Sequence, residues 1–348
     1  MDTRQIWQPI HPSLRPYLDP EYVAFHDQYM QYVIPDDLKI WDGTARTHPS
    51  LPPGGSAPIK VGRIQDISLS PNCRVRVFVP DDNMGDAKWP ALLWFHGGGW
   101  AIGGLDSEND FCAYVCQSVK AIVVTVDYRL APEHPYPAAA EDAVEALQWL
   151  IKEATKPTSL NIDFNRIAIG GTSAGGNLAA VLILEAACLF RSFKPVMQLL
   201  VVPVIDNTAV PGRGWVNLNA PWLTPARMLW YRNMYLPSGG PRADLSREDW
   251  QTSPNLAPKK LLSKCPQTWI AVSQHDLLAT EALSFAQQLR EVNVRADTKI
   301  YEGSTHSILG LNGVLSKGRE LMVDAVFVLS RAFRPQHFVP WPSPEGSV

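Results

Sequence analysis

The stretch RIAIGGTSAGG, residues 166–176, joins an apolar run to a cluster of small residues around Ser173. The apolar run has the composition of a buried strand, and the residues after the cluster have the 3.6-residue periodicity of a helix. Small residues on both sides of the serine leave room for a sharp bend of the backbone. The sequence therefore predicts a strand, a tight turn that carries Ser173, and a helix that begins just after it.

The chain on either side of this stretch alternates in the same way. From about residue 73 to residue 333, short β-branched apolar runs alternate with helical periodicity, which is typical of a mostly parallel sheet with crossover helices. We expect strands at residues 73–79, 91–95, 121–127, 166–170, 199–205, 268–273 and 298–301. We expect helices at residues 138–154, 175–190, 281–292 and 318–332. The predicted fold class is therefore α/β, with helices on both faces of one central sheet.

Two stretches rich in aromatic residues and proline do not follow this alternation: residues 1–65 precede the sheet, and residues 206–250 lie between two strands. One interpretation is that their aromatic side chains bury one another as small satellite cores. A functional interpretation is a helical cap over the strand ends, built from the N-terminal segment and an insertion after the sixth strand. The α/β domain then comprises residues 66–205 and 251–333, and residues 334–348 form an extended tail.

Charge, apolar stretches and cysteine spacing limit the binding partners and the cellular location that we expect for this protein. The 348 residues carry a formal net charge of −3 and no long charged run, so we expect a neutral small molecule and neither nucleic acid nor an anionic membrane as partner. No apolar stretch has the length of a signal peptide or a membrane span, which favours a cytoplasmic location without stable membrane insertion. The five cysteines lack the spacing of a metal site and are expected to be reduced thiols. The sequence leaves a homodimer open.

Ser173 is a candidate nucleophile, because the predicted turn exposes its hydroxyl beside the positive end of a helix dipole. The alternative is that this serine only caps the helix. Attack on a carbonyl also requires donors for the oxyanion, and the glycine-rich run HGGGW, residues 96–100, follows an apolar strand. We expect the donors among the backbone amides of Gly97, Gly98, Gly99 and Ala174, with Gly97, Gly98 and Ala174 as the main ones. No Gly-Lys-Ser/Thr follows the glycines, which argues against a phosphate loop.

A base and an acid are expected after the serine, near the ends of later strands. His306 lies in a short loop after the last predicted strand, and Asp276 follows the strand before it. Strand order therefore brings the two side chains together. We predict that His306 accepts the proton of Ser173 and that Asp276 orients the imidazole. Glu281 and Glu302 are weaker candidates for the acid, and for each a surface carboxylate is the other interpretation.

Three motifs in order carry a resemblance to a known family: HGGGW at residues 96–100, DYRLAPE at 127–133 and GTSAGGN at 171–177. Through them the chain resembles the hormone-sensitive lipase family of α/β-hydrolases, in a subgroup with the GTSAGG motif. The separation of Asp276 and His306 looks like the family's as well, and the resemblance covers roughly residues 60–333. It implies an α/β-hydrolase fold, a Ser-Asp-His catalytic triad, a helical cap, and neither metal nor organic cofactor.

The same resemblance implies scaffold roles for Asp127, Arg129 and Glu133. The chain departs from the family pattern at two places. Many members carry Asp where Thr172 precedes the nucleophile, and their second acidic position after Asp276 is lost in the run DLLAT, residues 276–280. Thr172 distinguishes the subgroup from other members of the family. The loss of the second acidic residue predicts that other contacts support the loop that carries Asp276.

These observations predict a serine carboxylesterase that hydrolyses short- to medium-chain or aryl esters through an acyl-enzyme. Three alternatives keep the same residues but change the outcome: an acyltransferase, a lactonase or a dehydratase that acts on a specialised metabolite. A non-catalytic small-molecule receptor on the same fold is a further alternative, although receptors of this family have lost the histidine and His306 is present.

Overall fold

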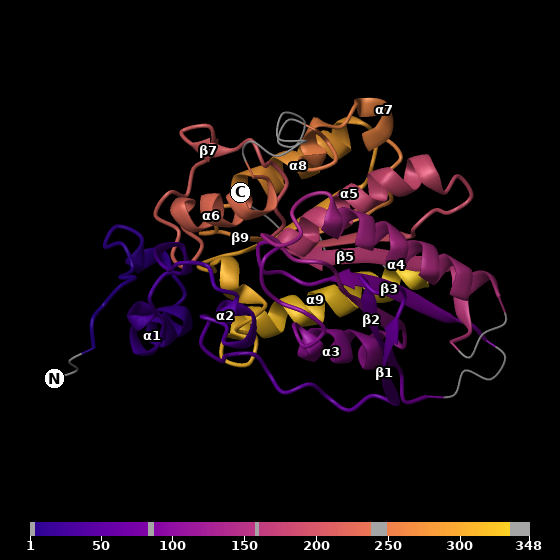
Figure 1. Ribbon diagram of the computed structural model, residues 1–348, viewed down its shortest axis with the longest axis horizontal. Helices are drawn as coiled ribbons and strands as arrows, with labels where there is room; N and C mark the ends of the chain where they lie inside the picture. The colour runs from indigo at the N-terminus through magenta and orange to yellow at the C-terminus, as the bar shows by residue number, and fades with distance from the viewer. Residues whose placement is uncertain (1–3, 83–86, 157–159, 238–248, 335–348) are drawn as a thin grey trace, which may run out of the picture.

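The computed structural model describes residues 4–82, 87–156, 160–237 and 249–334. Its centre is one eight-stranded sheet with the strand order β1-β2-β4-β3-β5-β6-β9-β10 (Figure 1). Strand β2 pairs antiparallel with both β1 and β4, and all other neighbours in this sheet are parallel. The strands are β1 (Arg63–Ser68), β2 (Arg74–Val79), β3 (Trp89–Phe95), β4 (Ile122–Asp127), β5 (Ile162–Thr172), β6 (Met197–Val201), β9 (Thr268–Ser273) and β10 (Ala296–Tyr301). The predicted α/β class with a mostly parallel sheet is confirmed.

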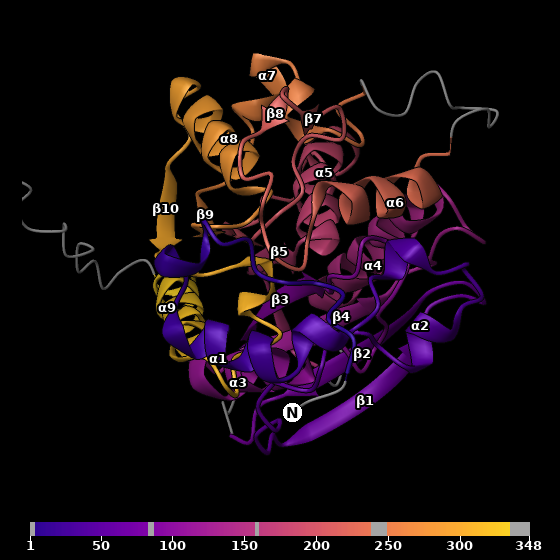
Figure 2. The same ribbon diagram turned by 90° about the vertical axis from the view of Figure 1, so that its left-hand side faces the viewer.

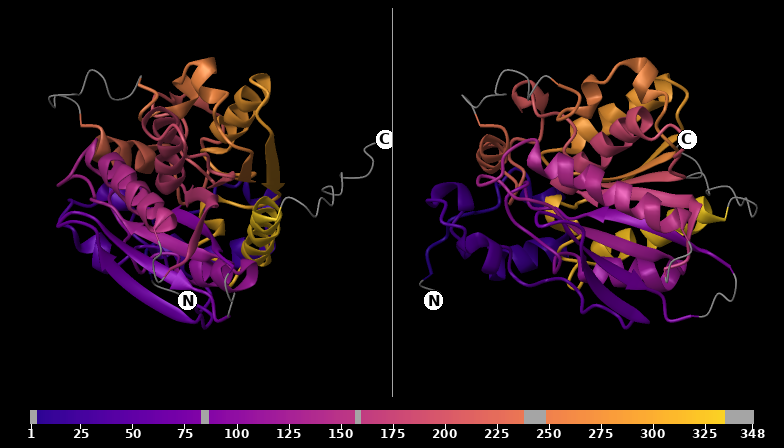
Figure 3. Two further views of the ribbon diagram at one scale, coloured as in Figure 1. Left: turned by 90° about the vertical axis from the view of Figure 1, so that its right-hand side faces the viewer. Right: turned by 45° about the vertical axis from the view of Figure 1, so that its right-hand side comes forward.

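Helices cover both faces of the sheet (Figure 3). The helices on one face are α4 (Ala138–Thr155), α5 (Ala174–Leu189) and α8 (Ala279–Glu291), and those on the other are α3 (Asn109–Val119) and α9 (Ser316–Phe333). Each interior strand therefore contributes alternate residues to two cores. In β3, Leu93 and Phe95 pack with the α5 side, whereas Leu92 and Trp94 pack with the α3 side. Because both faces are buried, these strands are apolar throughout and do not alternate in polarity.

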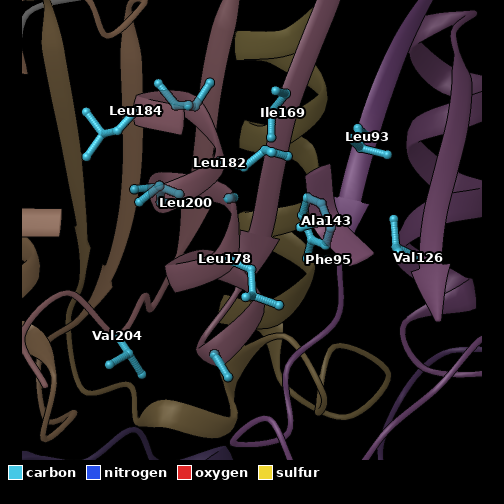
Figure 4. Packing of buried hydrophobic residues seen from close by; sticks show 14 of the residues in the cluster. Leu93, Phe95, Val126, Ala143, Ile169, Leu178, Leu182, Leu184, Leu200 and Val204 are labelled. Carbon is cyan, nitrogen blue, oxygen red and sulfur yellow. The ribbon is translucent and has the colours of Figure 1, made fainter. Parts of the chain in front are cut away.

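The core under α5 is built from aliphatic side chains of neighbouring elements. Figure 4 shows Leu178 and Leu182 of α5 in one cluster with Ile169 of β5 and Leu200 of β6. All four are at most 2% exposed. This packing fixes the position of α5 relative to the end of β5, where Ser173 lies.

Several boundaries differ from the sequence prediction; β5, for example, begins at Ile162 and not at residue 166. The strand expected at residues 199–205 is displaced, since β6 covers Met197–Val201, and Val202 turns away with φ of 40° before Pro203. The edge strand β1 was not predicted, because its residues are mostly exposed and only two of the six are large and apolar. Edge strands that face solvent give a weak hydrophobic signal.

The two aromatic stretches lie over one end of the sheet (Figure 2). The N-terminal stretch holds α1 (Pro20–Gln28), α2 (Thr44–Thr47) and the 3₁₀ turns η1 (Arg15–Tyr17), η2 (Met30–Tyr32) and η3 (Asp36–Leu38). The later stretch holds the small ribbon β7 (Val210–Pro211) and β8 (Gly214–Trp215) and the helix α6 (Pro225–Tyr235). Further along the chain are η4 (Pro254–Leu256), α7 (Lys259–Leu262) and η5 (His306–Ile308).

The two stretches contact each other. Trp41 of the first meets Trp230 of α6 edge to face at 5.8 Å between ring centroids, and Trp222 packs against a separate small core that contains Tyr22 and Met30. The satellite packing expected from the sequence is therefore present. The division into a cap and an α/β domain stays a prediction, and the expected tail, apart from Arg334, lies outside the described residues.

Candidate active site

Ser173 lies between β5 and α5 in a turn that only small residues permit. Its backbone has φ 54° and ψ −117°, an unfavourable region for a residue with a Cβ. A Cβ atom on Gly171 would lie 2.3 Å from the carbonyl oxygen of Gly175, and one on Gly175 would lie 2.1 Å from that of Phe95. The expected strand, turn and helix are therefore observed. Gly171 and Gly175 must be glycine, because a Cβ atom at either position would overlap backbone atoms.

A chain of hydrogen bonds joins the three predicted catalytic side chains. Nε2 of His306 is 2.9 Å from Oγ of Ser173, and Nδ1 of His306 is 2.8 Å from Oδ2 of Asp276. Asp276 follows β9 and His306 follows β10, and these strands are neighbours in the sheet. Ser173 is 8% exposed and Asp276 is 1% exposed. The structure thus brings together the serine, histidine and aspartate that the sequence singled out.

The loop that carries Asp276 is held from two sides. Oδ1 of Asp276 accepts a hydrogen bond from the amide of Leu278 at 3.1 Å, which leaves Oδ2 for His306. The side-chain amide of Asn217, in the stretch before α6, donates to the carbonyl oxygens of Gln274 and Asp276 at 3.0 and 2.8 Å. Asn217 was not found from the sequence, because a polar residue in a loop gives no sign of its distant partner. It supplies local support where the family's second acidic residue is lost.

The two weaker acid candidates lie elsewhere. Glu302 is exposed, as a surface carboxylate would be. Glu281 is 5% exposed, so the surface interpretation is wrong for it. Its oxygens accept hydrogen bonds from the amide of Ile205 at 2.7 Å and the indole of Trp215 at 3.3 Å. Burial raises the pKa of Glu281 to about 8. Glu281 lies in α8 and accepts a hydrogen bond from the backbone just before the insertion, which makes it a buried structural contact.

The glycine-rich loop after β3 lies directly beside Ser173. A Cβ atom on Gly97 would be 3.5 Å from Cβ of Ser173. Gly98 and Gly99 have φ of 119° and 59°, conformations that favour glycine. His96, before them, is fully buried and stacks on Tyr128 at 4.4 Å, and the Tyr128 hydroxyl donates to the carbonyl oxygen of His96. Burial lowers the pKa of His96, which favours its neutral form.

One expected oxyanion donor already has another partner. The amide of Gly97 donates to Oε1 of Glu108 at 3.0 Å, so the sequence prediction of Gly97 as a main donor requires correction. In the described part of the chain, the amides of Gly98 and Gly99 donate to no other group. The available set is therefore Gly98, Gly99 and Ala174. Glu108 was missed because a glutamate in the acidic run DSEND, residues 106–110, looks like a surface residue.

The helix α6 closes the site from above. The ring of Tyr231 packs on Gly99, where a Cβ atom would come within 2.3 Å of it. Trp100 and Tyr235 stack with ring centroids 4.4 Å apart and nearly parallel planes. A separate cavity of about 250 Å³ lies between α6 and the N-terminal stretch. Trp41 and Trp230 line it, but no residue of the triad or of the glycine-rich loop does. The oxyanion loop is therefore bounded by aromatic rings on the side away from the sheet.

The DYRLAPE segment makes ion pairs within the scaffold. Asp127 pairs with Arg74, and Glu133 pairs with Arg46. Arg129 binds the buried carboxylate of Asp142, at the start of α4, with distances of 2.8 to 3.0 Å. None of these contacts involves Ser173, His306 or Asp276, in keeping with the structural role that the resemblance implies.

No group of three or more His, Cys, Asp and Glu side chains among the described residues is arranged to hold a metal ion. No helix within the described ranges combines the length and apolarity needed to cross a membrane.

Comparison with known proteins identifies the family. A family profile described as the alpha/beta hydrolase fold matches residues 92–310. An AB hydrolase superfamily protein of Schizosaccharomyces pombe is 37% identical over 347 residues, which cover 93% of this chain and 97% of the relative. A carboxylesterase of Mycobacterium tuberculosis is 33% identical, over 74% of this chain and 78% of its own.

A solved structure agrees with these relatives. The hyperthermophilic esterase from Pyrobaculum calidifontis superposes with a TM-score of 0.69 and 32% identity, over 78% of this chain and 86% of that one. The matched segment runs from β3 through the glycine-rich loop and Ser173 to the loop that carries His306. The chain therefore belongs to the α/β-hydrolase family, in its hormone-sensitive lipase-like branch, as the sequence motifs predicted.

Proposed function

We propose that this chain is a serine carboxylesterase that hydrolyses short- to medium-chain or aryl carboxylic esters. The observation that carries the proposal is the unbroken chain of hydrogen bonds from Asp276 through His306 to Ser173. Relatives with the same fold are named a carboxylesterase and an esterase, which supports the ester as the substrate class.

The geometry supports acylation by the triad. Nε2 of His306 takes the proton of Ser173 as Oγ attacks the ester carbonyl, while Asp276 holds the proton on Nδ1 and stabilises the imidazolium. The negative charge then develops on the carbonyl oxygen, which the amides of Gly98, Gly99 and Ala174 bind. His306 returns its proton to the departing alkoxide, so an alcohol leaves and the acyl group stays on Oγ.

Water completes the cycle by the same steps. His306 removes a proton from water as the hydroxide attacks the acyl-enzyme carbonyl, and the oxyanion is bound as before. The proton then returns to Oγ of Ser173 and a carboxylic acid leaves. The reaction consumes one ester and one water and requires no group other than the residues already named.

Aryl esters are included for a structural reason. The ring of Tyr231 in α6 packs against Gly99 of the glycine-rich loop, and an aromatic ring of the substrate stacks favourably on such a side chain. A small-molecule ester is thus the expected partner. A homodimer stays a prediction, which sedimentation of the purified chain measures.

The proposed location is cytoplasmic. All five cysteines are free, and four of them, including Cys112 and Cys116, are buried. Free thiols suit a reducing compartment. A fluorescent fusion expressed from the native locus tests the location, and co-localisation with a secretory marker would contradict it.

The direct test is hydrolysis of p-nitrophenyl esters of two to twelve carbons by the wild-type chain and by Ser173→Ala. We expect the substitution to lower kcat by at least about 10³-fold, because removing the nucleophile leaves only binding and the oxyanion donors. Ser263→Ala, at an exposed serine, is the matched control and retains full activity. Hydrolysis that persists in Ser173→Ala would refute the mechanism.

Product analysis separates ester hydrolysis from acyl transfer and from ligand binding without catalysis. In water with added butanol, a hydrolase yields mainly the carboxylic acid, whereas an acyltransferase yields mainly the butyl ester. A receptor gives neither product and binds ligand with Ser173 unmodified.

A further inference from the structure

Glu108 is a carboxylic acid placed directly behind the oxyanion loop, outside the triad. Each of its two oxygens accepts one hydrogen bond from a group near the site. Oε1 accepts from the amide of Gly97 at 3.0 Å, and Oε2 accepts from the indole of Trp94 at 2.6 Å. The residue is half-buried, but its carboxyl end faces inward, and burial raises its pKa to about 7.

The backbone at Glu108 is itself unusual. Its φ of 58° places this residue in the left-handed region, directly before α3. A residue with a Cβ adopts this conformation at a cost of about 1 kcal/mol, so other contacts must stabilise it. The two hydrogen bonds of the carboxyl group are such contacts. They connect the start of α3 to β3, through Trp94, and to the loop that follows β3, through Gly97.

This carboxyl group, the loop and the nucleophile turn form one contact cluster. A Cβ atom on Gly97 would lie 3.3 Å from the carbonyl oxygen of Thr172 and 3.5 Å from both Oε1 of Glu108 and Cβ of Ser173. Gly97 thus lies against both Glu108 and the nucleophile turn.

The contacts of Gly97 determine which amides of the glycine-rich loop can bind a substrate oxygen. Because its N–H points at Glu108, Gly97 cannot use it for a substrate oxygen. Gly98 and Gly99 follow with positive φ, and their amides have no partner within the described residues. The hydrogen bond from Gly97 to Glu108 therefore fixes the orientation of the peptide group that contains the Gly97 amide. The orientation of the Gly98 and Gly99 amides depends on that of this peptide group.

We propose that Glu108 is a positioning residue of the oxyanion loop, which binds the Gly97 amide and thereby orients the amides of Gly98 and Gly99 toward the ester oxygen. The proposal rests on the proposed function, because it assigns Glu108 a role in that same reaction. Glu108 does not touch the substrate. It acts on the transition state only through the loop, since an oxyanion hole works when its donors are fixed before the reaction.

The charges around Glu108 fit this role. In the described part of the chain it forms no ion pair with Lys or Arg. Its neighbouring ionisable groups are Asp110, Cys112 and Tyr128. A carboxyl group in such surroundings is stabilised mainly by the donors that it binds, and those donors are the loop amide and one indole. Stabilisation of Glu108 and orientation of the loop therefore depend on the same hydrogen bond.

The test compares Glu108→Gln with Trp94→Phe. The carboxamide of Glu108→Gln has the size of the carboxyl but offers one acceptor oxygen to two donors, so the Gly97 contact is weakened. Trp94→Phe removes the other donor and leaves the Gly97 contact intact. For each protein, kcat and KM are measured on p-nitrophenyl acetate, together with the inhibition constant of a methyl trifluoromethyl ketone. Oγ of Ser173 adds to the ketone carbonyl, and the oxyanion of the resulting hemiketal mimics the transition state.

For Glu108→Gln we expect kcat to fall about 10- to 100-fold, less than for loss of a whole donor, with KM within about threefold of wild type. The inhibition constant of the ketone should rise by the same factor as kcat/KM falls. Trp94→Phe should change kcat and the inhibition constant by less than about threefold. A purely structural role would instead lower the folded fraction and leave kcat per labelled Ser173 unchanged.

Glu108→Asp provides the second variant, because it keeps two acceptor oxygens with a shorter reach, and we expect a loss of kcat between wild type and Glu108→Gln. The inference is overturned if Glu108→Gln keeps kcat and ketone affinity within twofold, or if Trp94→Phe loses as much as Glu108→Gln. Failure of the proposed function looks different. In that case the wild-type chain itself neither hydrolyses the ester nor takes a phosphonate on Ser173.

Discussion

The nucleophile turn and the helix α6 above it meet at the same end of the sheet, but different parts of the chain determine their shapes. At the turn, backbone atoms leave no room: a Cβ atom on Gly175 would lie 2.1 Å from the carbonyl oxygen of Phe95. Above it, side chains make the contacts, as between Trp41 and Trp230. At Gly212, between β7 and β8 in the stretch that also holds α6, a Cβ atom would meet nothing within 4 Å. We infer that changes at the turn abolish the chemistry, whereas changes above it alter the choice of substrate.

The largest expected effect is that of Gly175→Ala. The new methyl group overlaps a backbone carbonyl, which cannot move without displacing β3, so we expect kcat to fall at least about 10³-fold and the chain to lose stability by more than the roughly 1–3 kcal/mol typical of overpacking. Gly212→Ala is the matched control. Its φ of 81° makes alanine unfavourable by about 1 kcal/mol. We expect its kcat to stay within twofold. Equal effects of the two substitutions, measured by ester hydrolysis and thermal unfolding, would remove the distinction between the regions.

Asp276→Asn should have the next largest effect. The amide presents a donor or an uncharged acceptor to Nδ1 of His306 and no longer stabilises the imidazolium, so we expect kcat to fall on the order of 10³- to 10⁴-fold with little change in KM. Glu302→Gln, at the exposed candidate, is the control and should change kcat less than twofold. A loss of only a few fold in Asp276→Asn would show that another group orients His306.

Trp230→Ala probes the upper region and should change selectivity more than chemistry. Trp230 packs edge to face against Tyr231, whose ring lies on Gly99. Its loss should lower kcat/KM for phenyl acetate about 5- to 10-fold relative to ethyl acetate, as expected for about 1 kcal/mol of ring contact. The rate of labelling of Ser173 by a small phosphonate should stay within twofold. Trp7→Ala, at a tryptophan that is 38% exposed, is the control. An equal loss on both esters would contradict a role in substrate choice.

The smallest effect concerns pH and Glu281. Its pKa is raised from 4.5 to about 8 in the folded chain, so between these values the folded state keeps a proton that the unfolded state releases. Stability from this group is therefore highest below about pH 4.5 and falls as pH rises toward 8. Between pH 6 and 8.5 we expect Tm of the wild type to fall on the order of 2–4 °C more than Tm of Glu281→Gln. Parallel curves for the two proteins would contradict the buried, protonated carboxyl.

The sequence predicted the parts that depend on backbone geometry and strand order. Gly171 and Gly175 are glycines because the turn requires it, and such a requirement is visible as a motif. Asp276 and His306 were found because parallel strands end at one edge of a sheet, so residues that follow β9 and β10 must be neighbours.

The sequence did not reveal the polar contacts that depend on tertiary packing. Glu108 and Glu281 look like surface carboxylates in the sequence, and only the fold shows that each accepts hydrogen bonds from a backbone amide and an indole. The same limit explains the correction at Gly97, because a glycine motif shows that amides are accessible but not which group each one binds. The end of β6 was misplaced since hydrophobicity continues past the residue at which pairing stops.

The most direct test of the central claim is mass spectrometry of the chain after treatment with a p-nitrophenyl alkylphosphonate. The account predicts one phosphonate per chain, attached to the peptide that contains Ser173, with esterase activity lost in proportion to labelling and protection by a competing ester. Trp7→Ala should be labelled like the wild type, and Ser173→Ala should not be labelled. Full ester hydrolysis by a chain whose Ser173 stays unlabelled, or an adduct at another serine that accounts for the lost activity, would contradict it.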